Sequence, residues 1–425
     1  MTEHFVVTWL LEYIGDQIDF RQYGGQKGNS ITHYIIEFIN FILSCQDSQE
    51  KIAVLAGLVD FQKAFNRQDH SILVTKLCDM GVPAWLLRIV ISFLSNRQMF
   101  VLYKGKKSSI RKMPGGGPQG TILALLLFLV LVNDIGFANQ VNNTGSLATA
   151  KRDLKIFNEI HLKYVDDLTL AEAVNMPLQL TLANSRQRPL PDRFQSRTGH
   201  ILPQSHSRVF QQLEKIEEYA ETNHMKINFK KTQVMVFNPC SSLDFFPEFT
   251  LAENQLEVVN EIQLLGLTIR SDLKWHSNTR RMVVKASKRL WMIRRLKSLG
   301  ADQEALLDVY IKQIRSILEL AVPAWQGALT MSEKTDLERI QKSACYIIMG
   351  RDHVSYKHSL TTLNIDTLEN RRNKLSLNFA RKAEKHQKFK YWFIPYIKKV
   401  NTRQSNLKYL PVRANHARYK NSTVQ

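Results

Sequence analysis

The feature that most constrains the fold is a pair of adjacent carboxylates, Asp166 and Asp167, inside the largely apolar stretch 161–170. Short apolar segments on both sides of a polar pair predict a β-hairpin with the two acids at its turn. Adjacent carboxylates repel each other, and a fold tolerates them best where a cation neutralises them. For an isolated pair, a solvated turn is the simpler interpretation. The hypothesis of a cation site therefore depends on whether further acidic residues join the pair.

A third carboxylate, Asp60, directly follows the apolar run 52–59. Such a run predicts a buried strand, which would place Asp60 at its exit. Three carboxylates at the ends of neighbouring strands form an all-oxygen site suited to Mg²⁺. Two such ions, about 3.5–4 Å apart, can clamp the attacking and leaving oxygens of a phosphoryl transfer. The sequence therefore indicates Asp60, Asp166 and Asp167 as metal ligands of a catalytic site.

Charge is distributed unevenly along the 425 residues, whose net charge is +20. Residues 271–425 carry 31 Lys and Arg against 12 Asp and Glu, while residues 1–270 carry 27 against 26. A half that basic indicates a polyanionic partner, most simply nucleic acid. A solubilising or targeting tail is the alternative. The hydrophobic content of 44% excludes a disordered chain.

The cysteines and the apolar runs indicate the cellular setting. Cys45, Cys78, Cys240 and Cys345 show no Cys-x-x-Cys spacing, which favours a reduced intracellular protein without structural zinc. The longest apolar run, 122–132, is 11 residues long, whereas a membrane span needs about 18. We therefore expect a core helix there, no signal peptide and no membrane partner.

Two glycine-rich segments precede apolar helices. Residues 22–32 form a polar loop that can bring backbone N–H groups and Lys27 close to phosphates, although most such loops are plain turns. Residues 113–123 leave the backbone bare for a ligand and then start an apolar helix whose N-terminus favours anions. The candidate nucleotide contacts of this second segment are Gly117, Pro118 and Gln119.

Phe65 follows Asp60 by five residues, close enough for its ring to line the same pocket. A ring beneath a nucleotide sugar would leave no room for a 2′-hydroxyl, the group that separates RNA precursors from DNA precursors. A core Phe on the next helix is the alternative.

Taken in order, these segments resemble the palm of a reverse transcriptase of the non-LTR (LINE-type) retrotransposons. The matching stretches are Asp60 with Phe61 and Phe65, Gly117-Pro-Gln-Gly120, Tyr164-Val-Asp-Asp167, Asn228-Phe-Lys-Lys-Thr232 and Leu265-Gly-Leu-Thr-Ile269. Any single motif is common, whereas the ordered set is specific.

The resemblance implies an RNA-directed DNA polymerase that uses an RNA template, a DNA primer, dNTPs and two Mg²⁺ ions, which Mn²⁺ can replace. Asp60 and Asp166 would hold both ions and Asp167 would support one of them. Lys231 would act as general acid beside the leaving pyrophosphate. Contacts to the incoming nucleotide would come from Lys27, Phe61, Phe65, Gly117, Pro118 and Gln119.

The implied architecture is an α+β right-hand polymerase fold with an antiparallel-sheet palm. We expect partial fingers in residues 1–50, a palm in 51–270 with loop insertions near 136–160 and 175–207, a helical thumb in 271–350 and a basic C-terminal region in 351–425. Because few residues precede the first glycine-rich loop, the missing fingers or an endonuclease are expected on an upstream part of the same element protein. Such a protein would act in the nucleus and cytoplasm as a ribonucleoprotein.

The region after Trp275 is expected to be helical. Apolar residues at helical spacing, from Met282 to Leu296, form one stripe that has a basic flank suited to a duplex backbone. Together with the motif at 265–269, this flank gives the predicted nucleic-acid contacts: Leu265, Gly266, Arg281, Lys285, Lys288 and Arg295. Aromatic residues interleaved with Lys after 385 suit base stacking, and a small satellite core is as compatible.

The sequence leaves two alternative functions to consider. A non-catalytic, inactive or domesticated fragment that still binds nucleic acid is suggested by the short N-terminal region, and the intact Asp60, Asp166 and Asp167 argue against it. A polymerase that makes RNA is disfavoured by the bulky Phe65.

Overall fold

The computed structural model describes residues 2–47, 52–113, 115–135, 159–175, 207–238, 249–393 and 409. Of the insertions expected near 136–160 and 175–207, only residues 159, 160, 175 and 207 fall inside these ranges. Cys240 and Tyr396 lie outside the described residues.

The chain divides into two compact units that alternate along the sequence. Unit 1 comprises Met1–Ser30, Val54–Val236 and Ser242–Val258, and unit 2 comprises Ile31–Ala53, Phe237–Ser241 and Val259–Gln425. The borders of these units differ from the expected domain borders, because residues 31–53 group with the C-terminal part and the last segment of unit 2 begins at 259 rather than 271. The division into fingers, palm and thumb stays a prediction.

Unit 1 is built on a six-stranded sheet with the order β6-β7-β1-β8-β10-β9. Its strands are β1 (Ile52–Val59), β6 (Glu159–Tyr164), β7 (Asp167–Asn175), β8 (Gln233–Phe237), β9 (Phe249–Leu251) and β10 (Asn254–Val258). Strands β6 and β7 are antiparallel, as are β9 and β10. However, β10 pairs with β8 in parallel.

The expectation of an antiparallel sheet is therefore wrong at one pair. After β8 the chain reaches the sheet edge at β9 and returns through a hairpin to β10. The returning strand lies between β8 and β9, so it runs in the same direction as β8. The sheet is mixed, and the fold is α+β.

The central strand β1 is buried at every position after Ile52, as its continuous apolar run predicts. Helix α9 (Arg208–Thr222), which begins at the side-chain cap Ser207, packs on the sheet with a buried apolar stripe. Gly57 permits this approach, since a Cβ atom there would lie 3.1 Å from Cγ1 of Val209.

Helices α1 (Thr2–Ile14), α3 (His70–Asp79), α4 (Ala84–Leu94) and α5 (Ile122–Leu131) form the rest of the core of unit 1. Helix α5 is buried over most of its length and contacts both α1 and α3, so the predicted core helix is confirmed. Short 3₁₀ turns η1 (Gly15–Gln17) and η2 (Ala64–Arg67) connect these elements.

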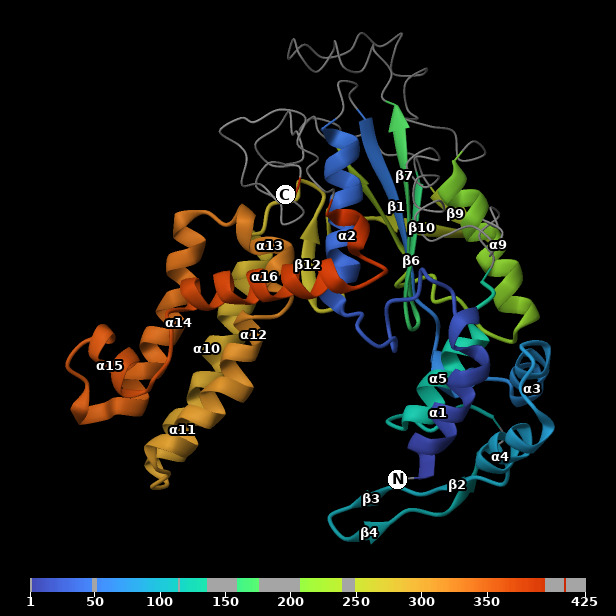
Figure 1. Cartoon of the computed structure of the whole chain (residues 1–425), viewed down its shortest axis with the longest axis horizontal. Coiled ribbons are helices and arrows are strands. Elements are labelled where there is room, and N and C mark those ends of the chain that lie inside the picture. The colour runs from blue at the N-terminus through green and yellow to red at the C-terminus, as the bar shows by residue number, and fades with distance from the viewer. Residues whose placement is uncertain are drawn as a thin grey trace. The chain divides into compact units, whose positions relative to one another are not determined.

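Residues 97–113 form a two-stranded arm that extends beyond α4 (Figure 1). Antiparallel pairing joins β2 (Gln98–Met99) to β5 (Arg111–Lys112) and β3 (Leu102–Tyr103) to β4 (Lys106–Lys107). Every residue from 98 to 112 is exposed. The exposed residues include six large hydrophobic ones: Met99, Phe100, Val101, Leu102, Tyr103 and Ile110. A hairpin of this kind gains little stability from burial.

Unit 2 is mainly helical. Its elements are α2 (Ile31–Gln46), β11 (Glu261–Leu264), β12 (Leu267–Arg270), α10 (His276–Ser298), α11 (Gln303–Val309), the π-helix η4 (Tyr310–Arg315), α12 (Ser316–Leu318), α13 (Val322–Trp325), η5 (Gln326–Ala328), α14 (Met331–Met349), η6 (Gly350–Asp352), α15 (Tyr356–Thr362), α16 (Leu368–Lys385) and η7 (Lys390–Trp392).

Packing of α10 against α14 forms the centre of unit 2. The predicted apolar stripe of α10 is buried at Met282, Ala286, Leu290 and Ile293. Beside it, the buried Tyr310 donates a hydrogen bond of 2.6 Å from its hydroxyl to Oε1 of Gln341. A buried polar pair satisfied in this way costs little and orients the helices that carry it.

Two of the aromatic residues after 385, Phe389 and Trp392, pack into a satellite core, which was the alternative interpretation. Phe389 is buried and stacks on His33 of α2, with ring centroids 4.0 Å apart. Trp392 donates from Nε1 to Oε2 of Glu37 over 3.0 Å, and the hydroxyl of Tyr391 donates to the same carboxylate. These contacts leave Phe389 unavailable for stacking on bases.

Among the helices that the structure describes, none is both long and apolar enough to cross a bilayer.

Candidate active site

The two adjacent acids lie at the turn of the β6–β7 hairpin, as the sequence predicts. Tyr164 pairs with Asp167 across the hairpin, so Val165 and Asp166 form the turn. The φ angle of Val165 is 60°, in the left-handed region. A β-branched residue is strained there, and strain of this kind persists only where neighbouring residues hold it.

The first glycine-rich segment holds this turn. Gln22 bridges to Lys163 in parallel, so residues 21–24 run beside β6. Oε1 of Gln22 accepts hydrogen bonds of 2.9 Å from the backbone N–H groups of Val165 and Gly24. A Cβ atom on Gly24 would lie 2.5 Å from Cγ2 of Val165, so only glycine fits. The predicted phosphate contact, Lys27, lies a few residues further on and is exposed.

A buried ion pair fixes the strand that leads into the turn. Lys163 is 0% exposed, and its Nζ lies 2.7 Å from Oδ2 of Asp19. The same ammonium donates to the backbone carbonyl of Asn133 over 2.9 Å. Burial alone would raise the pKa of Asp19, yet Lys163 and Arg21 hold it well below its usual range. Sequence analysis missed this pair, because Lys163 alternates with apolar residues in the way a solvated strand residue does.

Asp60 follows β1, and the segment 228–232 surrounds it. Nδ2 of Asn228 donates a hydrogen bond of 2.8 Å to Oδ2 of Asp60, and the Asn228 backbone N–H donates to the Asp60 carbonyl over 2.8 Å. Nζ of Lys231 lies 3.8 Å from the same Oδ2, and its side chain is 70% exposed. The structure thus brings the predicted Lys231 to the predicted Asp60. It also adds Asn228, which only the motif around it could have indicated.

The three carboxylates act on one another electrostatically. Burial raises the pKa of Asp167 to about 6, with further increases from Asp166 and Asp60 that Lys231 partly offsets. Burial also raises the pKa of Asp166, and Asp60 adds to this effect. The carboxylates from β1 and from the hairpin therefore lie in one region of unit 1. Mutual repulsion of this kind is relieved when a cation binds.

The donor chemistry of this cluster fits a hard divalent cation, since all its ligands are partly buried carboxylate oxygens. Within the described ranges, no three or more His, Cys, Asp or Glu side chains stand close enough to form a finished metal site. Asp60 is engaged instead by Asn228 and Lys231. A bound cation would therefore compete with these two partners.

The predicted nucleotide residues gather where the second glycine-rich segment meets residues 65–68. Phe65 is half-buried and stacks on Phe128 of α5, with ring centroids 4.6 Å apart. Its carbonyl accepts a hydrogen bond of 2.8 Å from the Gly117 N–H. At Gly116, where φ is 82°, a Cβ atom would lie 2.9 Å from the Asn66 backbone. The glycines are required here because two backbones touch.

Other predicted residues of this group lie less centrally. Pro118 is half-buried, and Gln119 is exposed in the turn before α5 rather than on the helix. The helix begins after Thr121, whose side chain caps it by accepting from the Ala124 N–H over 3.2 Å. Phe61 is 4% exposed, so its ring belongs to the core.

Gln68 was not anticipated. It is 1% exposed, and neither of its amide atoms has a hydrogen-bond partner in the part of the chain that the structure describes. A Cβ atom on Gly117 would lie 2.5 Å from its Oε1. An unpaired buried amide is costly, so its position against the glycine segment marks Gln68 as a functional candidate.

In unit 2 the predicted nucleic-acid residues occupy one hairpin and one helix face. Leu265 and Gly266 form the tip between β11 and β12, with φ angles of 48° and 85°. The basic flank of α10 is exposed along its length, at Arg281, Lys285, Lys288 and Arg295. Nη1 of Arg281 also donates to Oγ1 of Thr268 over 3.3 Å, which connects the flank to the hairpin.

The arm 97–113 is a further surface that sequence analysis missed. No Asp or Glu occurs between Asp79 and Asp134, whereas seven Lys and Arg do. Five of these cations, Lys104, Lys106, Lys107, Arg111 and Lys112, are exposed on the arm beside its hydrophobic side chains. That acid-free stretch was the available signal. The even overall balance of residues 1–270 concealed it.

Comparison with known proteins gives relatives of one kind. No family model matches the chain. It is 23% identical over 377 residues to a probable RNA-directed DNA polymerase from transposon BS of Drosophila melanogaster, covering 86% of this chain and 36% of that protein. It is 31% identical over 114 residues to the RNA-directed DNA polymerase from mobile element jockey of the same species, covering 27% of this chain and 12% of that protein. The chain is similar in sequence to RNA-directed DNA polymerases of mobile elements.

The chain spans about a third or less of the length of these curated relatives. Among solved structures, it aligns with telomerase from Candida albicans in complex with a fragment of telomeric RNA, at a TM-score of 0.41 and 12% identity, covering 89% of this chain and 51% of that one. Apo telomerase from Candida tropicalis aligns at a TM-score of 0.38 and 12% identity, covering 91% and 55%. These values are too low to establish a shared fold.

Proposed function

We propose that this chain is the polymerase part of a mobile-element protein and extends a DNA primer on an RNA template with dNTPs. The observation that carries the proposal is the cluster of Asp60, Asp166 and Asp167, whose burial and mutual repulsion prepare a cation site on strands of one sheet. The relatives, which are RNA-directed DNA polymerases of mobile elements, support the same activity. A right-hand polymerase architecture with palm, fingers and thumb is part of this proposal.

The residues of the cluster have distinct roles in the proposed reaction. Asp60 and Asp166 would hold two Mg²⁺ ions, or Mn²⁺ in their place, and Asp167 would support one of them. When bound, the ions lower the pKa of the primer 3′-hydroxyl and neutralise the leaving pyrophosphate. Lys231, exposed beside Asp60, has the reach to give a proton to the departing phosphate.

Selection of the sugar would depend on Phe65. Its ring is held by stacking on Phe128, and its backbone is held by the hydrogen bond that its carbonyl accepts from the Gly117 N–H. A fixed ring beneath the sugar would exclude a 2′-hydroxyl by contact. Backbone of Gly117 and Pro118 lies beside it, with Gln119 and Lys27 as further contacts for the nucleotide.

Two basic surfaces would bind the nucleic acid. On unit 1 the arm combines exposed cations with exposed aromatic rings, the pattern that suits backbone phosphates together with base stacking. On unit 2 the α10 flank, with the hairpin tip at Leu265 and Gly266, would follow a duplex backbone. Upstream fingers or an endonuclease on the same element protein, and a ribonucleoprotein in nucleus and cytoplasm, complete the proposal.

The decisive experiment measures dNTP incorporation on a primed RNA template, for this chain and for a version extended upstream. Asp166→Asn should abolish Mg²⁺-dependent incorporation, because a carboxamide is a poorer ligand for a hard cation. Duplex binding should stay within a few-fold of the unchanged chain. Asp79→Asn, an exposed acid on α3, is the matched control and should keep full incorporation.

Equal incorporation by the Asp166→Asn variant and the unchanged chain would refute the catalytic assignment. Binding to duplex without any incorporation, even by the extended version, would favour the second function, an inactive fragment that binds nucleic acid.

A further inference from the structure

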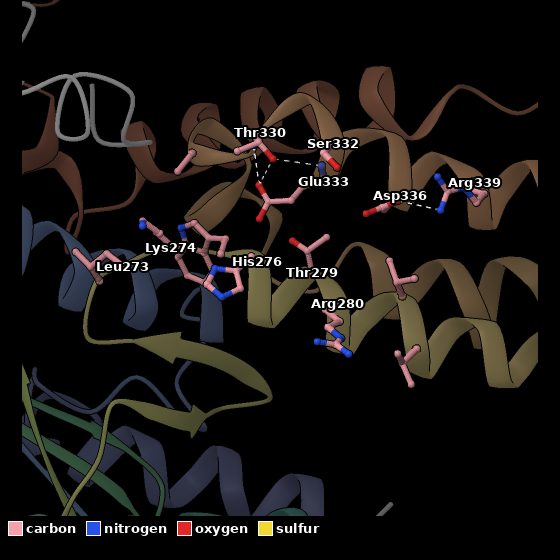
Figure 2. Close-up of a pocket in the computed structure, with 14 residues that line it drawn as sticks. Leu273, Lys274, His276, Thr279, Arg280, Thr330, Ser332, Glu333, Asp336 and Arg339 are labelled. Carbon is pink, nitrogen blue, oxygen red and sulfur yellow. Dashed lines mark hydrogen bonds and ion pairs between the residues drawn. The ribbon is translucent and has the colours of Figure 1, made fainter. Parts of the chain in front are cut away.

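Helix α10 has an exposed face that the packing of unit 2 does not use. Its 23 residues include eight Lys and Arg and no Asp or Glu. One side of the helix, with Met282 and Ile293, is buried. In Figure 2, Thr279 points toward α14, whereas Arg280 lies on the side of α10 that is turned away from α14. The helix therefore presents a second face to solvent.

Trp291 lies at the centre of this exposed face. Its side chain is 64% exposed, and Val284, two turns earlier on the same face, is exposed as well. A single exposed apolar residue is ordinary on a protein surface. The residues around Trp291 are therefore needed to interpret it.

Cations flank Trp291 on both sides. With about 3.6 residues per turn, the basic flank of α10 lies along one side of Trp291, and Arg280 and Arg294 lie along the other. All of these cations are exposed, and none of them forms an ion pair among the residues that the structure describes. The face is thus an aromatic ring between two rows of positive charge.

This pattern fits a nucleic-acid duplex better than other partners. A duplex has two rows of phosphates with a groove between them, which matches two rows of cations with a ring between them. A helix that binds a membrane surface needs a broad apolar face, and the apolar stripe of α10 is already buried in unit 2. A protein partner would need a strongly acidic surface to match these cations.

The dimensions of the grooves decide which duplex fits. A helix with its side chains is about 10–12 Å wide, and the minor groove of B-form DNA is only about 6 Å wide. The minor groove of an A-form duplex is wide and shallow and exposes the sugars. A hybrid of RNA and DNA has A-form geometry.

We propose that the exposed face of α10 lies over the minor groove of an RNA–DNA hybrid, with Trp291 packed on the sugars and the cations at the phosphates of both strands. The inference rests on the proposed function, because extension of a DNA primer on an RNA template produces this hybrid. The cations supply affinity for any duplex, and Trp291 selects the A-form.

The test measures binding of the full chain, without dNTPs, to a blunt RNA–DNA hybrid and to a DNA duplex of the same sequence. Trp291→Ala should weaken binding to the hybrid about tenfold, a loss typical of a Trp at the centre of an interface. The loss should be the same at every salt concentration, because a neutral ring releases no counterions. Binding to the DNA duplex should change little. Leu377→Ala, which removes exposed apolar surface from α16, is the control and should bind like the unchanged chain.

Modified bases identify the groove. N2-ethylguanine places an alkyl group in the minor groove, and 5-methylcytosine places a methyl group in the major groove. A hybrid with N2-ethylguanine should bind the unchanged chain as weakly as the ordinary hybrid binds Trp291→Ala. A hybrid with 5-methylcytosine should bind normally, and weaker binding of this hybrid alone would overturn the assignment to the minor groove.

No binding of the hybrid by the unchanged chain, or equal binding by Trp291→Ala, would overturn the proposal. An equal loss for the hybrid and the DNA duplex would also overturn it, since the ring would then contact a feature that both share. A melting curve shows that Trp291→Ala is folded, and its melting temperature should not fall, because the ring is exposed. Incorporation of dNTPs is measured separately. Its failure would count against the polymerase and not against Trp291, because the binding test requires no catalysis.

Discussion

At the scale of single residues, Asp167 is where stability and function conflict most directly. Its pKa is raised to about 6, above the ordinary value of 3.8, by burial and by its neighbouring carboxylates. Its ionised form is therefore disfavoured in the folded chain. The associated stability is present below the ordinary pKa and is lost as the pH rises through about 6. At neutral pH and without a bound cation, Asp167 carries a charge, although the fold would be more stable if this side chain were neutral.

We predict that Asp167→Asn stabilises the metal-free protein at pH 8. The expected gain in unfolding free energy is on the order of 1 kcal/mol, reduced from the full shift because solvent screens part of it. The gain should shrink toward pH 5, where Asp167 takes up a proton. Thermal melts in EDTA across this range measure it. A lower melting temperature at pH 8 would show that the carboxylate is held by unseen favourable contacts, and Asp79→Asn should show no change at either pH.

A second residue, Lys163, is essential to the same hairpin. Its charge stabilises the fold, whereas the charge of Asp167 destabilises it. Its charge is buried and satisfied by Asp19 and by a backbone carbonyl, so removing it leaves Asp19 ionised and without its closest counter-charge. Breaking a buried pair by deleting one partner costs about 3–5 kcal/mol. Lys163→Met should therefore lower the urea midpoint strongly.

The exposed Lys231 provides the control for this change. Lys231→Met removes an equal charge from the same neighbourhood, but its side chain is 70% exposed, so the midpoint should barely move. Adding Asp19→Asn to Lys163→Met should restore part of the loss. If Lys163→Met and Lys231→Met were equally stable, the buried pair would not hold the hairpin.

At the scale of elements, the arm 97–113 differs from the other elements that the structure describes in unit 1. Its strands have no covering layer, and its side chains combine rings with cations, including Lys107 over the ring of Phe100 at 5.1 Å. An element that buries so little is stabilised mainly by what it binds. Its charge makes a polyanion the natural partner.

We predict that replacing Lys104, Lys106, Lys107 and Lys112 together by Gln weakens binding to nucleic acid and flattens its salt dependence. Each lost phosphate contact changes the slope of log affinity against log salt by about 0.9. The variant with Arg at all four positions keeps the charge and should keep the slope. Titrations at several salt concentrations measure this, and an unchanged slope in the Gln variant would exclude the arm from the interface. The melting temperature should not move, since all four residues are exposed.

At the scale of the whole molecule, excess charge is carried mostly by unit 2. Residues 271–425 hold 31 Lys and Arg against 12 Asp and Glu. The α10 flank presents four of these cations on one exposed face, while the opposite stripe of the helix is buried. Charge and packing are thus separated on the same helix.

We therefore expect that reversing Arg281, Lys285, Lys288 and Arg295 to Glu flattens the salt dependence of duplex binding without unfolding α10. The apolar stripe at Met282, Ala286 and Leu290 is unchanged in this variant. Exchanging Lys and Arg at the four positions is the control and should preserve binding. Should the reversed variant keep its slope, this flank faces solvent, and circular dichroism confirms in either case that the helix is intact.

Sequence reasoning succeeded where short-range patterns decide the structure. The hairpin around Asp166, the buried strand before Asp60 and the core helix 122–131 all follow from local apolar spacing. It failed where partners lie far apart in the chain. Lys163 is buried only because Asp19 meets it, and the parallel pairing of β10 depends on the path of the chain through β9. The candidate site was found through its acids, and Asn228 lies in a motif that the resemblance includes, whereas the contacts of Gln68 and Gly24 follow from no local pattern.

The contact between Gly24 and Val165 has an evolutionary consequence. A side chain at position 24 would collide with the Val165 methyl group, and the strained turn at Val165 depends in part on the hydrogen bond that its backbone N–H donates to Gln22. The same Cβ atom would also lie 2.8 Å from the backbone N of Val165, so a smaller residue at 165 would not make room for alanine or serine at 24. Relatives that keep this turn should therefore keep glycine at position 24, whichever residue stands at 165.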